Sequence, residues 1–395
     1  MKNENLVPKV RFKGFSDPWE QRKLGNISEI TTGKAFHSSD FSIDGIYKVI
    51  TNKNVRDKLH NKQFEGDRIN LSNESLQKFI LHGHNILVTM DGANIGQTGV
   101  YNDKHAVLAQ RVGRIVASQT NFVYQIVHNS KFIRTMNIKS VGNAIKHISL
   151  KQIGDYNSFI PLEKLEREKI GILLTDLDNL IAANEDKLEQ LKTLKKLLMQ
   201  KIFSQEWRFK GFTDPWEQRK LGDFGNVAMN KRIFKDETLP HGGIPFYKIG
   251  TFGKKADAFI SRKMFVEYKH KYPFPKKGDI LISASGSIGR TIEYQGEDAY
   301  YQDSNIVWLN HNQRLSNSFL KHFYNTVSWS GVEGSTIKRL YNKNLLGTKI
   351  RVPHIQEQER VGKILNKTDD LIAANEDKLR QLKELKKYLM QNMFV

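Results

Sequence analysis

Basic side chains stand beside small polar ones in two parts of the chain where β-like runs give way to turns. DNA phosphates are contacted by Lys, Arg and backbone amides, whereas base edges are read by Arg, Lys, Asn, Gln, Ser or Thr. Both kinds of residue occur here, and they predict DNA contacts from Lys48, Asn52, Lys53, Asn54 and Arg56 in one part and from Lys248, Thr251, Lys254 and Lys255 in the other. Any single one of them can equally be a solvated surface residue, so the prediction rests on the clusters.

Two further pairs of segments match between these parts of the chain. Lys146-His147 and Lys338-Arg339 follow similar short runs, and we expect them to contact the DNA backbone. The glycine turns at 91–96 and 285–289 are expected to present polar side chains to DNA, although a plain β-turn is the alternative. The expected contacts in this group are Asn94, Gln97, Ser287 and Arg290, and Lys34, Lys231 and Arg232 complete the predicted set.

Several kinds of chemistry are excluded or disfavoured by the sequence. The chain has no cysteine, which removes disulfides, thiolate nucleophiles and cysteine-ligated metals. Neither glycine turn fits the phosphate-loop pattern, and Gly33-Lys34 lacks the upstream glycine. His82 and His84 form a lone pair without further ligands, which does not predict a metal site.

A DNA methyltransferase would need an Asn/Asp-Pro-Pro-aromatic tetrad and a glycine-rich cofactor site. Asp17-Pro-Trp and Asp214-Pro-Trp contain one proline each, and we expect Trp19 and Trp216 to be packing residues. No convincing cluster of carboxylates and lysine on a strand indicates a nuclease.

The charge balance favours a polyanionic partner. The 395 residues carry a formal net charge of +20, which is typical of proteins that bind nucleic acid, with an anionic membrane as the competing partner. No apolar run of about 18 residues and no hydrophobic leader are visible. We therefore expect a cytoplasmic protein that does not span a membrane.

The elements that must position these residues lie in segments that occur twice in the chain. Residues 11–25 (RFKGFSDPWEQRKLG) and 208–222 (RFKGFTDPWEQRKLG) differ only at Ser16 and Thr213, and residues 180–200 and 371–391 are also nearly identical. The segments between them, 27–160 and 227–350, have diverged. A repeated frame with two divergent inserts predicts two recognition heads.

Each repeat ends in a helix with the four-three spacing of a coiled coil. The predicted seam contains Ile181, Asn184, Leu188 and Leu191 in the first helix and Ile372, Asn375, Leu379 and Leu382 in the second. A polar seam residue fixes register at some cost in stability, while a solvent-facing Asn is the alternative.

Chain connectivity predicts that the two helices run antiparallel if they pair. Phe203 lies five residues before Arg208, so the second head must begin where the first helix ends. Phe394 should then approach Arg11 as Phe203 approaches Arg208, which gives a pseudo-twofold, effectively circular arrangement. From Ile170 to Leu198 the helix rises roughly 40 Å, about one turn of B-DNA, and so it could act as a ruler.

The fold class expected for the heads is α+β. Short β-like runs such as 86–89, 280–283 and 306–309 alternate with Gly, Asn and short helical stretches. Residual similarities between the inserts indicate a shared fold with different surfaces.

This pattern resembles the specificity subunit of type I restriction-modification systems. The resemblance rests on the two segments at 17–25 and 214–222, the strand with its Ile-Gly turn, and the helix start Pro353-His-Ile-Gln-Glu-Gln358, from which the first copy departs at 161–167. It implies target-recognition domains at 1–160 and 205–352, and conserved coiled-coil regions at 161–204 and 353–395.

The resemblance also implies a function and partners. The chain would be a non-catalytic reader of a bipartite, asymmetric site in double-stranded DNA, with one half-site per head. Two modification subunits would methylate adenine using S-adenosylmethionine, and two restriction subunits would cleave DNA using ATP and Mg. The chain itself would bind no cofactor.

Two other functions remain open from the residues alone. One is a self-contained DNA methyltransferase or nuclease whose catalytic motifs are not recognisable. The other is a coiled-coil bridging protein whose charge serves RNA or a membrane. The base sequence read by each head and the spacer length do not follow from the residues.

Overall fold

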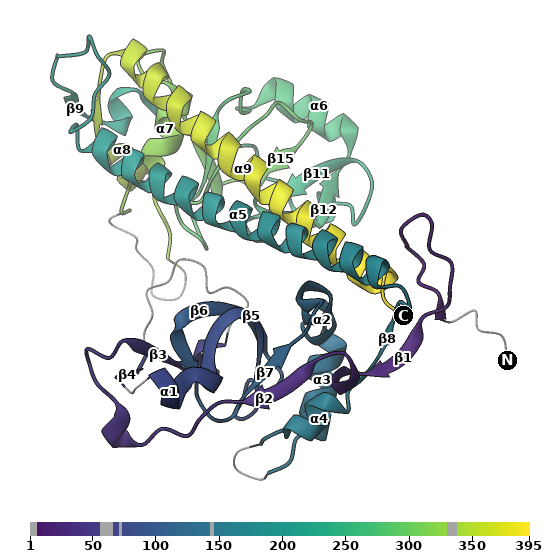
Figure 1. Cartoon of the computed structure of the whole chain (residues 1–395). Coiled ribbons are helices and arrows are strands. Elements are labelled where there is room, and N and C mark those ends of the chain that lie inside the picture. The colour runs from purple at the N-terminus through teal and green to yellow at the C-terminus, as the bar shows by residue number, and fades with distance from the viewer. Residues whose placement is uncertain (1–5, 56–65, 71–72, 143–145, 330–337) are drawn as a thin grey trace. The chain divides into compact units, whose positions relative to one another are not determined.

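The computed structural model describes residues 6–55, 66–70, 73–142, 146–329 and 338–395. The chain divides into two compact units, Met1–Lys187 with Glu376–Val395, and Leu188–Asn375. Each unit contains one head together with parts of two long helices, α5 at Lys164–Phe203 and α9 at Ile355–Asn392 (Figure 1).

The first head is built on a six-stranded sheet with the order β2-β7-β5-β6-β3-β4, and β1 pairs with β8 beside it. Neighbouring strands are antiparallel except β3 and β6, which run parallel with Lys48 opposite Ala106. The strands are β1 Glu20–Lys23, β2 Glu29–Thr32, β3 Tyr47–Ile50, β4 Arg68–Ile69, β5 Ile80–Thr89, β6 Thr98–Leu108, β7 Val112–Val116 and β8 Asn157–Ile160. The helices are α1 Asn73–Leu76, α2 Thr120–Val127, α3 Ser130–Lys139 and α4 Leu150–Gly154.

The second head has the same strand order in two pieces, β10-β16-β13-β14 and β15-β11-β12, and β17 pairs with β9. The long β6 of the first head corresponds to β14 and β15 together, which confirms that the heads share an α+β fold. The strands are β9 Glu217–Lys220, β10 Gly225–Ala228, β11 Ile244–Tyr247, β12 Ala258–Ile260, β13 Ile280–Ser283, β14 Thr291–Glu293, β15 Tyr300–Tyr301, β16 Ile306–His311 and β17 Lys349–Val352. The helices are α6 Arg262–Lys271, α7 Asn317–Tyr324 and α8 Asn342–Gly347.

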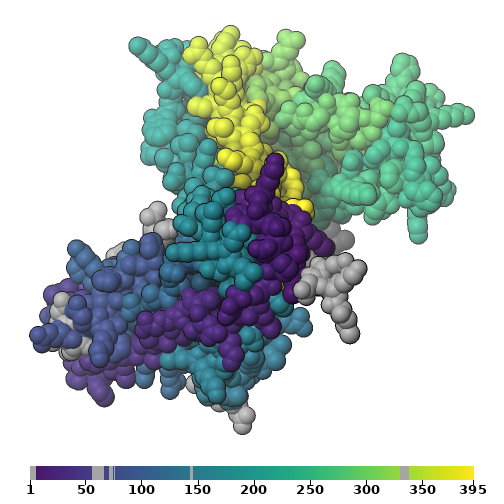
Figure 2. Space-filling view, turned by 45° about the vertical axis from the view of Figure 1, so that its right-hand side comes forward, coloured from purple at the N-terminus to yellow at the C-terminus, as the bar shows by residue number. Residues whose placement is uncertain are grey.

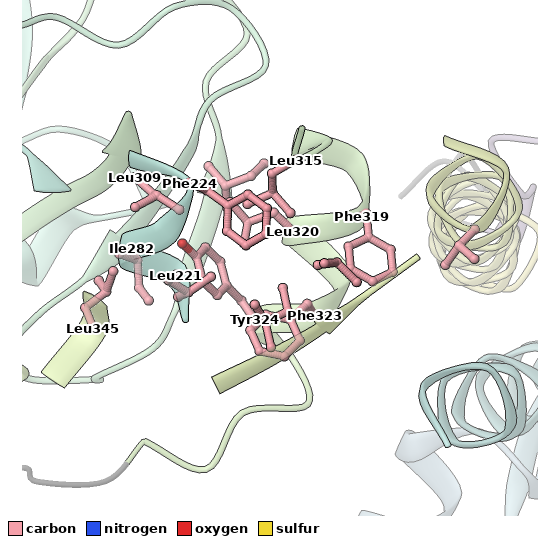
Figure 3. Packing of buried hydrophobic residues seen from close by; sticks show 14 of the residues in the cluster. Leu221, Phe224, Ile282, Leu309, Leu315, Phe319, Leu320, Phe323, Tyr324 and Leu345 are labelled. Carbon is pink, nitrogen blue, oxygen red and sulfur yellow. The ribbon is translucent and has the colours of Figure 1, made fainter. Parts of the chain in front are cut away.

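One amphipathic helix in each head closes the core against the sheet. In the second head, Phe319, Phe323 and Tyr324 of α7 share a cluster with Ile282 and Leu309 of the sheet (Figure 3). In the first head, α2 makes the corresponding cluster with β5 and β7. Burial of these aromatic side chains contributes apolar contact between helix and sheet.

The residues of the predicted coiled-coil seam are buried or half-buried. Ile181 and Leu379 are buried, and Leu188, Leu191, Ile372 and Leu382 are half-buried. Asn184 and Asn375 are each 6% exposed, which supports their seam positions over the solvent-facing alternative.

Ion pairs between the long helices show that they run antiparallel in the first unit, and an equivalent pair joins them in the second. In the first unit Lys386 lies 2.5 Å from Asp178, and Lys383 lies 2.8 Å from Glu185. In the second unit Lys195 lies 2.5 Å from Asp369. Lys195 and Lys386 are equivalent positions of the repeat, and so are Asp178 and Asp369.

The repeated segments clasp each head to its helix through a buried ion pair. The Arg11 guanidinium donates two hydrogen bonds to Glu166, at 2.7 and 2.8 Å, and Glu166 is fully buried. Arg208 donates to Glu357 in the same way, at 3.0 and 2.7 Å. A bidentate pair of this kind fixes orientation as well as distance.

Aromatic contacts complete the clasp. The ring centroid of Trp19 lies 5.9 Å from that of Phe394, and the centroid of Trp216 lies 6.2 Å from that of Phe203. The exposed fractions of Trp19 and Trp216 are 1% and 6%, so both are packing residues as expected. The approach of Phe394 to the first repeated segment is confirmed.

The backbone repeats the same joint in each unit. The Val10 N–H donates to the Asn392 carbonyl at 2.9 Å, and the Trp207 N–H donates to the Lys201 carbonyl at 3.0 Å. The first head is therefore joined to the end of α9 by hydrogen bonds and packing. The second head is joined to the end of α5 by the same kinds of contact and also by the chain itself.

Candidate nucleic-acid interface

Asp91 brings four loops of the first head together. Its carboxylate accepts a hydrogen bond from the Asn52 side-chain amide and pairs with Arg111 at 3.3 Å. The Asn52 side-chain carbonyl accepts from the Met90 backbone N–H at 3.3 Å. The backbone of Asp91 also forms a bridge with that of His147. The predicted residues of the 52–54, 91–97 and 146–147 segments therefore belong to one surface.

A buried hydroxyl holds the turn between β5 and β6. Thr89, which is fully buried, donates from Oγ1 to the Asn94 carbonyl and accepts from the Gln97 N–H at 3.0 Å. Gly92 and Gly96 have φ values of 82° and 80°, which glycine adopts without strain. The turn leaves the side chains of Asn94 and Gln97 exposed.

The second head builds the same turn from different side chains. The Ser283 hydroxyl donates to the Ser287 carbonyl and accepts from the Arg290 N–H at 3.0 Å. Gly286 and Gly289 have positive φ values of 64° and 84°. Ser287 and Arg290 are exposed, in the places that Asn94 and Gln97 occupy in the first head.

Two further segments of the second head meet at Ser285. Its hydroxyl donates to Asn305 at 2.8 Å, and its backbone bridges that of Arg339. The Arg339 guanidinium donates to the Ser304 carbonyl at 2.7 Å. Arg232 pairs with Asp303 at 2.9 Å, which adds the 231–232 segment to the same surface.

The predicted residues fall into two groups by exposure. Those exposed to solvent are Lys53, Asn94, Gln97, Lys146 and His147 in the first head and Lys231, Arg232, Lys254, Lys255, Ser287, Arg290 and Lys338 in the second. Those half-buried are Lys34, Lys48, Asn52 and Asn54 in the first head and Lys248, Thr251 and Arg339 in the second. Arg56 lies outside the described residues.

Some half-buried members also make contacts within their own head. Lys48 pairs with Asp103 at 2.9 Å within the sheet, and Lys248 pairs with Asp257 at 3.0 Å. Burial acts to raise the pKa of Asp103, but the His105 N–H and the Lys48 ammonium outweigh it and lower that pKa. The Asn54 side chain accepts from the Thr51 N–H, and the Thr251 hydroxyl accepts from the Lys248 N–H.

Sequence reasoning missed Arg111, which lies in the first surface. Its side chain is 65% exposed, and its backbone has a positive φ of 67°, a conformation that non-glycine residues rarely adopt. Ser304, in the matching turn of the second head, has a φ of 58°. In the sequence, a single charged residue between two apolar strands does not indicate a positive φ or a place in the interface.

Thr89 and Ser283 were also missed, although a signal was present. Both directly follow the matched apolar runs 86–88 and 280–282, where a hydroxyl ends an otherwise apolar strand. A buried hydroxyl in that place needs partners, and the following turn supplies them.

Two kinds of site are not found among the described residues. No group of three or more His, Asp or Glu side chains in this part of the chain is placed to hold a metal ion. Within the same ranges, no helix has the length and apolar composition needed to cross a membrane.

Two heads with one strand order, each clasped to long helices and each with its own set of exposed basic and amide side chains, define a duplicated, two-headed recognition scaffold. The family model described as type I restriction modification DNA specificity domain matches residues 16–193 and 213–384. The chain belongs to this family.

Individual relatives agree with the family match. A putative type I restriction enzyme specificity subunit of Haemophilus influenzae, S.HindORF215P, is 57% identical over 153 residues, which are 38% of this chain and 40% of that protein. The type I restriction enzyme MjaVIII specificity subunit of Methanocaldococcus jannaschii is 25% identical over 95% of this chain and 91% of its own length. The crystal structure of the type I restriction-modification S subunit from M. genitalium has a TM-score of 0.69 at 18% identity, covering 98% of this chain and 99% of that one, and it supports the fold.

Proposed function

We propose that this chain is the specificity subunit of a type I restriction-modification complex. It binds an asymmetric, bipartite site in double-stranded DNA and reads one half-site with each head. In doing so it directs adenine methylation and DNA cleavage by partner subunits. Its place is the cytoplasm, with the DNA and the partners.

One observation supports this proposal above the others. The two heads hold the same turn with the same backbone and hydroxyl bonds, yet they expose Asn94 and Gln97 in one case and Ser287 and Arg290 in the other. A constant frame with changed donors and acceptors is what two readers of different base sequences require. The net charge of +20 adds the attraction for phosphate that both heads need.

The proposed role is non-catalytic. Two modification subunits would supply methyl transfer from S-adenosylmethionine, and two restriction subunits would supply cleavage with ATP and Mg. This chain would hold none of these cofactors and would contribute the choice of DNA sequence.

The long helices offer a surface for such partners. Leucines also lie outside the buried seam in every second heptad and are exposed, with Leu180 at 44%, Leu194 at 45%, Leu371 at 56% and Leu385 at 47%. Figure 2 shows part of the α9 surface, in yellow, that the second head leaves uncovered. Exposed leucines on one face of a helix favour packing against a further helix.

The experiment that tests the function is methylation of a random-sequence DNA library. The chain would be co-expressed with a type I modification subunit, with the chain alone as control, and modified adenines would be read by sequencing. We expect a split motif only when the partner is present. Exchange of residues 27–160 for those of another family member should then change one half-site and leave the other.

Two outcomes would overturn the proposal. Methylation by the chain alone would indicate a self-contained methyltransferase. No motif from a verified complex, together with DNA affinity that depends weakly on salt, would favour a bridging protein, because phosphate contacts give a steep salt dependence.

Partner docking has its own matched test. Leu194→Lys places a charge on the exposed apolar face, whereas Thr193→Lys adds the same charge at an exposed polar position about 100° away around the helix. We expect the first variant to lose co-purification with the modification subunit and the second to keep it. Equal retention by both variants would argue against docking on this face.

A further inference from the structure

Each head rests one helix on a glycine of a long helix. A Cβ atom at Gly171 of α5 would lie 2.6 Å from the Phe122 backbone nitrogen of α2. A Cβ atom at Gly362 of α9 would lie 2.1 Å from the Ser318 hydroxyl of α7. These are equivalent contacts, since Gly171 and Gly362 differ by 191 in number and residues 121 and 318 differ by 197. Only glycine lets the two helices approach this closely.

Several residues around this contact are the same in both units. Arg11 and Glu166 have their counterparts in Arg208 and Glu357, and Phe122 has its counterpart in Phe319. The shared set holds either head in the same way and does not tell the two heads apart.

Beside the glycine contact of the first unit, the long helix donates a hydrogen bond and the head accepts it. The Arg167 Nε donates to the Gln119 side-chain carbonyl at 2.6 Å, and Arg167 Nη1 donates to the Pro161 carbonyl at 2.7 Å. Gln119 in turn donates to the Lys164 carbonyl at 2.7 Å. Gln119 is the residue directly before α2.

In the second unit the direction of this hydrogen bond is reversed. The Ser316 backbone N–H, directly before α7, donates to the Gln358 side-chain carbonyl at 2.9 Å. The Gln358 amide donates to the Pro353 and Arg314 carbonyls at 2.9 and 3.0 Å, and this side chain is 1% exposed. Ser316 occupies the position of Gln119, and Gln358 occupies that of Arg167.

A second polar contact differs in the same manner. Gln125 of α2 donates to Asp178 of α5 at 3.0 Å, whereas His322 of α7, at the equivalent position, bonds to Asn366 of α9 at 3.0 Å. On the head, Gln125 is replaced by His322. On the long helix, the partner shifts from Asp178, which is kept as Asp369, to Asn366, which stands where the first unit has Thr175.

We propose that Gln119 with Arg167, and Ser316 with Gln358, are docking pairs that match each head to its own long helix. Arginine has no hydrogen-bond acceptor, so the second head placed on Arg167 would set a backbone donor against a side-chain donor. The first head placed on Gln358 meets an amide that offers both a donor and an acceptor. The match is thus asymmetric, because the site at α9 tolerates either head and the site at α5 rejects the second.

The test uses the full-length chain and two sets of substitutions. In the second unit these are Gln358→Arg, Ser316→Gln and both together, and in the first unit Arg167→Gln, Gln119→Ser and both together. Gln356→Arg is the control, since it adds the same guanidinium at an exposed position two residues away. The readouts are thermal unfolding and amide hydrogen exchange at the starts of α2 and α7.

Three results are expected. Gln358→Arg lowers the unfolding temperature by about 2–4 °C and speeds exchange at the start of α7 about tenfold, because the Ser316 N–H loses its acceptor. Adding Ser316→Gln recovers most of the lost unfolding temperature, because the new side-chain carbonyl accepts from the arginine as Gln119 does from Arg167, while exchange of the N–H of residue 316 itself stays fast. Arg167→Gln has a smaller effect than Gln358→Arg, and the control has none.

The proposal is overturned if the double substitution shows the sum of the two single effects, or if Arg167→Gln costs as much as Gln358→Arg. Should Gln358→Arg fail to fold, Ser316→Gln must restore folding. Failure to do so also overturns the proposal. None of these readouts depends on DNA or on partner subunits, so a failure here is distinct from a failure of the proposed function.

Discussion

Single hydroxyl groups shape the candidate interface. Thr89 and Ser283 each bond to a carbonyl and an N–H of the turn that follows, and this holds the exposed side chains of that turn in place. Asn52 acts in the same supporting way through Asp91, and its DNA contact stays a prediction. The contact with Asp91 could not be predicted from the sequence, because Asp91 is 39 residues away and no residue near Asn52 indicates this partner.

Replacement of Thr89 by Val tests this bracing. The substitution keeps the shape of the side chain and removes both hydrogen bonds, so we expect a loss of about 1–3 kcal/mol in the free energy of unfolding. Methylation specificity should weaken at one half-site only. Denaturant unfolding and library methylation measure the two effects, and equal weakening of both half-sites would contradict the assignment of one head to one half-site.

His322 gives a pH-dependent prediction. Burial lowers its pKa, and the opposing effects of Asn366 and Asp369 do not compensate, while Lys321 and Lys195 lower it further. The stability gained from the neutral ring is full above its ordinary pKa of 6.5 and is lost as the pH falls from there through the lowered folded-state pKa.

The measurement is the unfolding temperature of the wild type and of His322→Gln between about pH 7 and pH 5. Glutamine stands at the equivalent position of the first head, as Gln125, and does not titrate. We expect the wild type to lose stability over this range faster than the variant. Parallel curves would show that His322 does not contribute to the acid sensitivity.

At the scale of elements, the helices were the most predictable part and the head sheets the least. The four-three spacing identified the seam from Ile181 to Leu191 and from Ile372 to Leu382, because local periodicity reports which face is buried. Lys195 and Lys386 also lie in this register, but a charged side chain gives no apolar signal in the sequence. Their place in the seam follows from the opposing Asp369 and Asp178. Strand order could not be predicted, since it depends on contacts between segments far apart in the sequence.

The ion pairs of the seam predict that the neighbouring carboxylates of Asp369 and Asp370 contribute differently to the free energy of unfolding. Asp369→Ala removes the partner of Lys195, which is about three-quarters buried, so we expect a loss of about 1 kcal/mol. Asp370→Ala changes an exposed residue and should have no effect. The measurement is thermal unfolding of both variants. Equal stability of the two would mean that the ion pair between Lys195 and Asp369 contributes nothing.

At the scale of the whole molecule, the two compact units repeat one joint between head and helices. Phe394 packs on Trp19 and Phe122, and Phe203 packs on Trp216 and Phe319. The duplicated sequence predicted this equivalence, because identical segments are expected to make identical contacts. It did not predict the docking pairs, which lie where the copies differ.

Substitution of each phenylalanine by Ala should act on one unit at a time. We expect Phe394→Ala to weaken the first unit and Phe203→Ala the second, each by about 2 kcal/mol, through lost aromatic packing. Hydrogen exchange resolved along the chain separates the two effects. Loss of protection across both units from either variant would show that they unfold as one cooperative body.

The strand β6 of the first head and its counterparts β14 and β15 in the second show where such a head can change. β14 pairs with β13, and β15 pairs with β11, so the two parts that correspond to β6 pair with different neighbouring strands. Residues 294–299 interrupt it without removing either pairing. New segments can therefore enter a head at this point while its attachment to the helices stays as it was, which gives natural variation and protein engineering the same entry point.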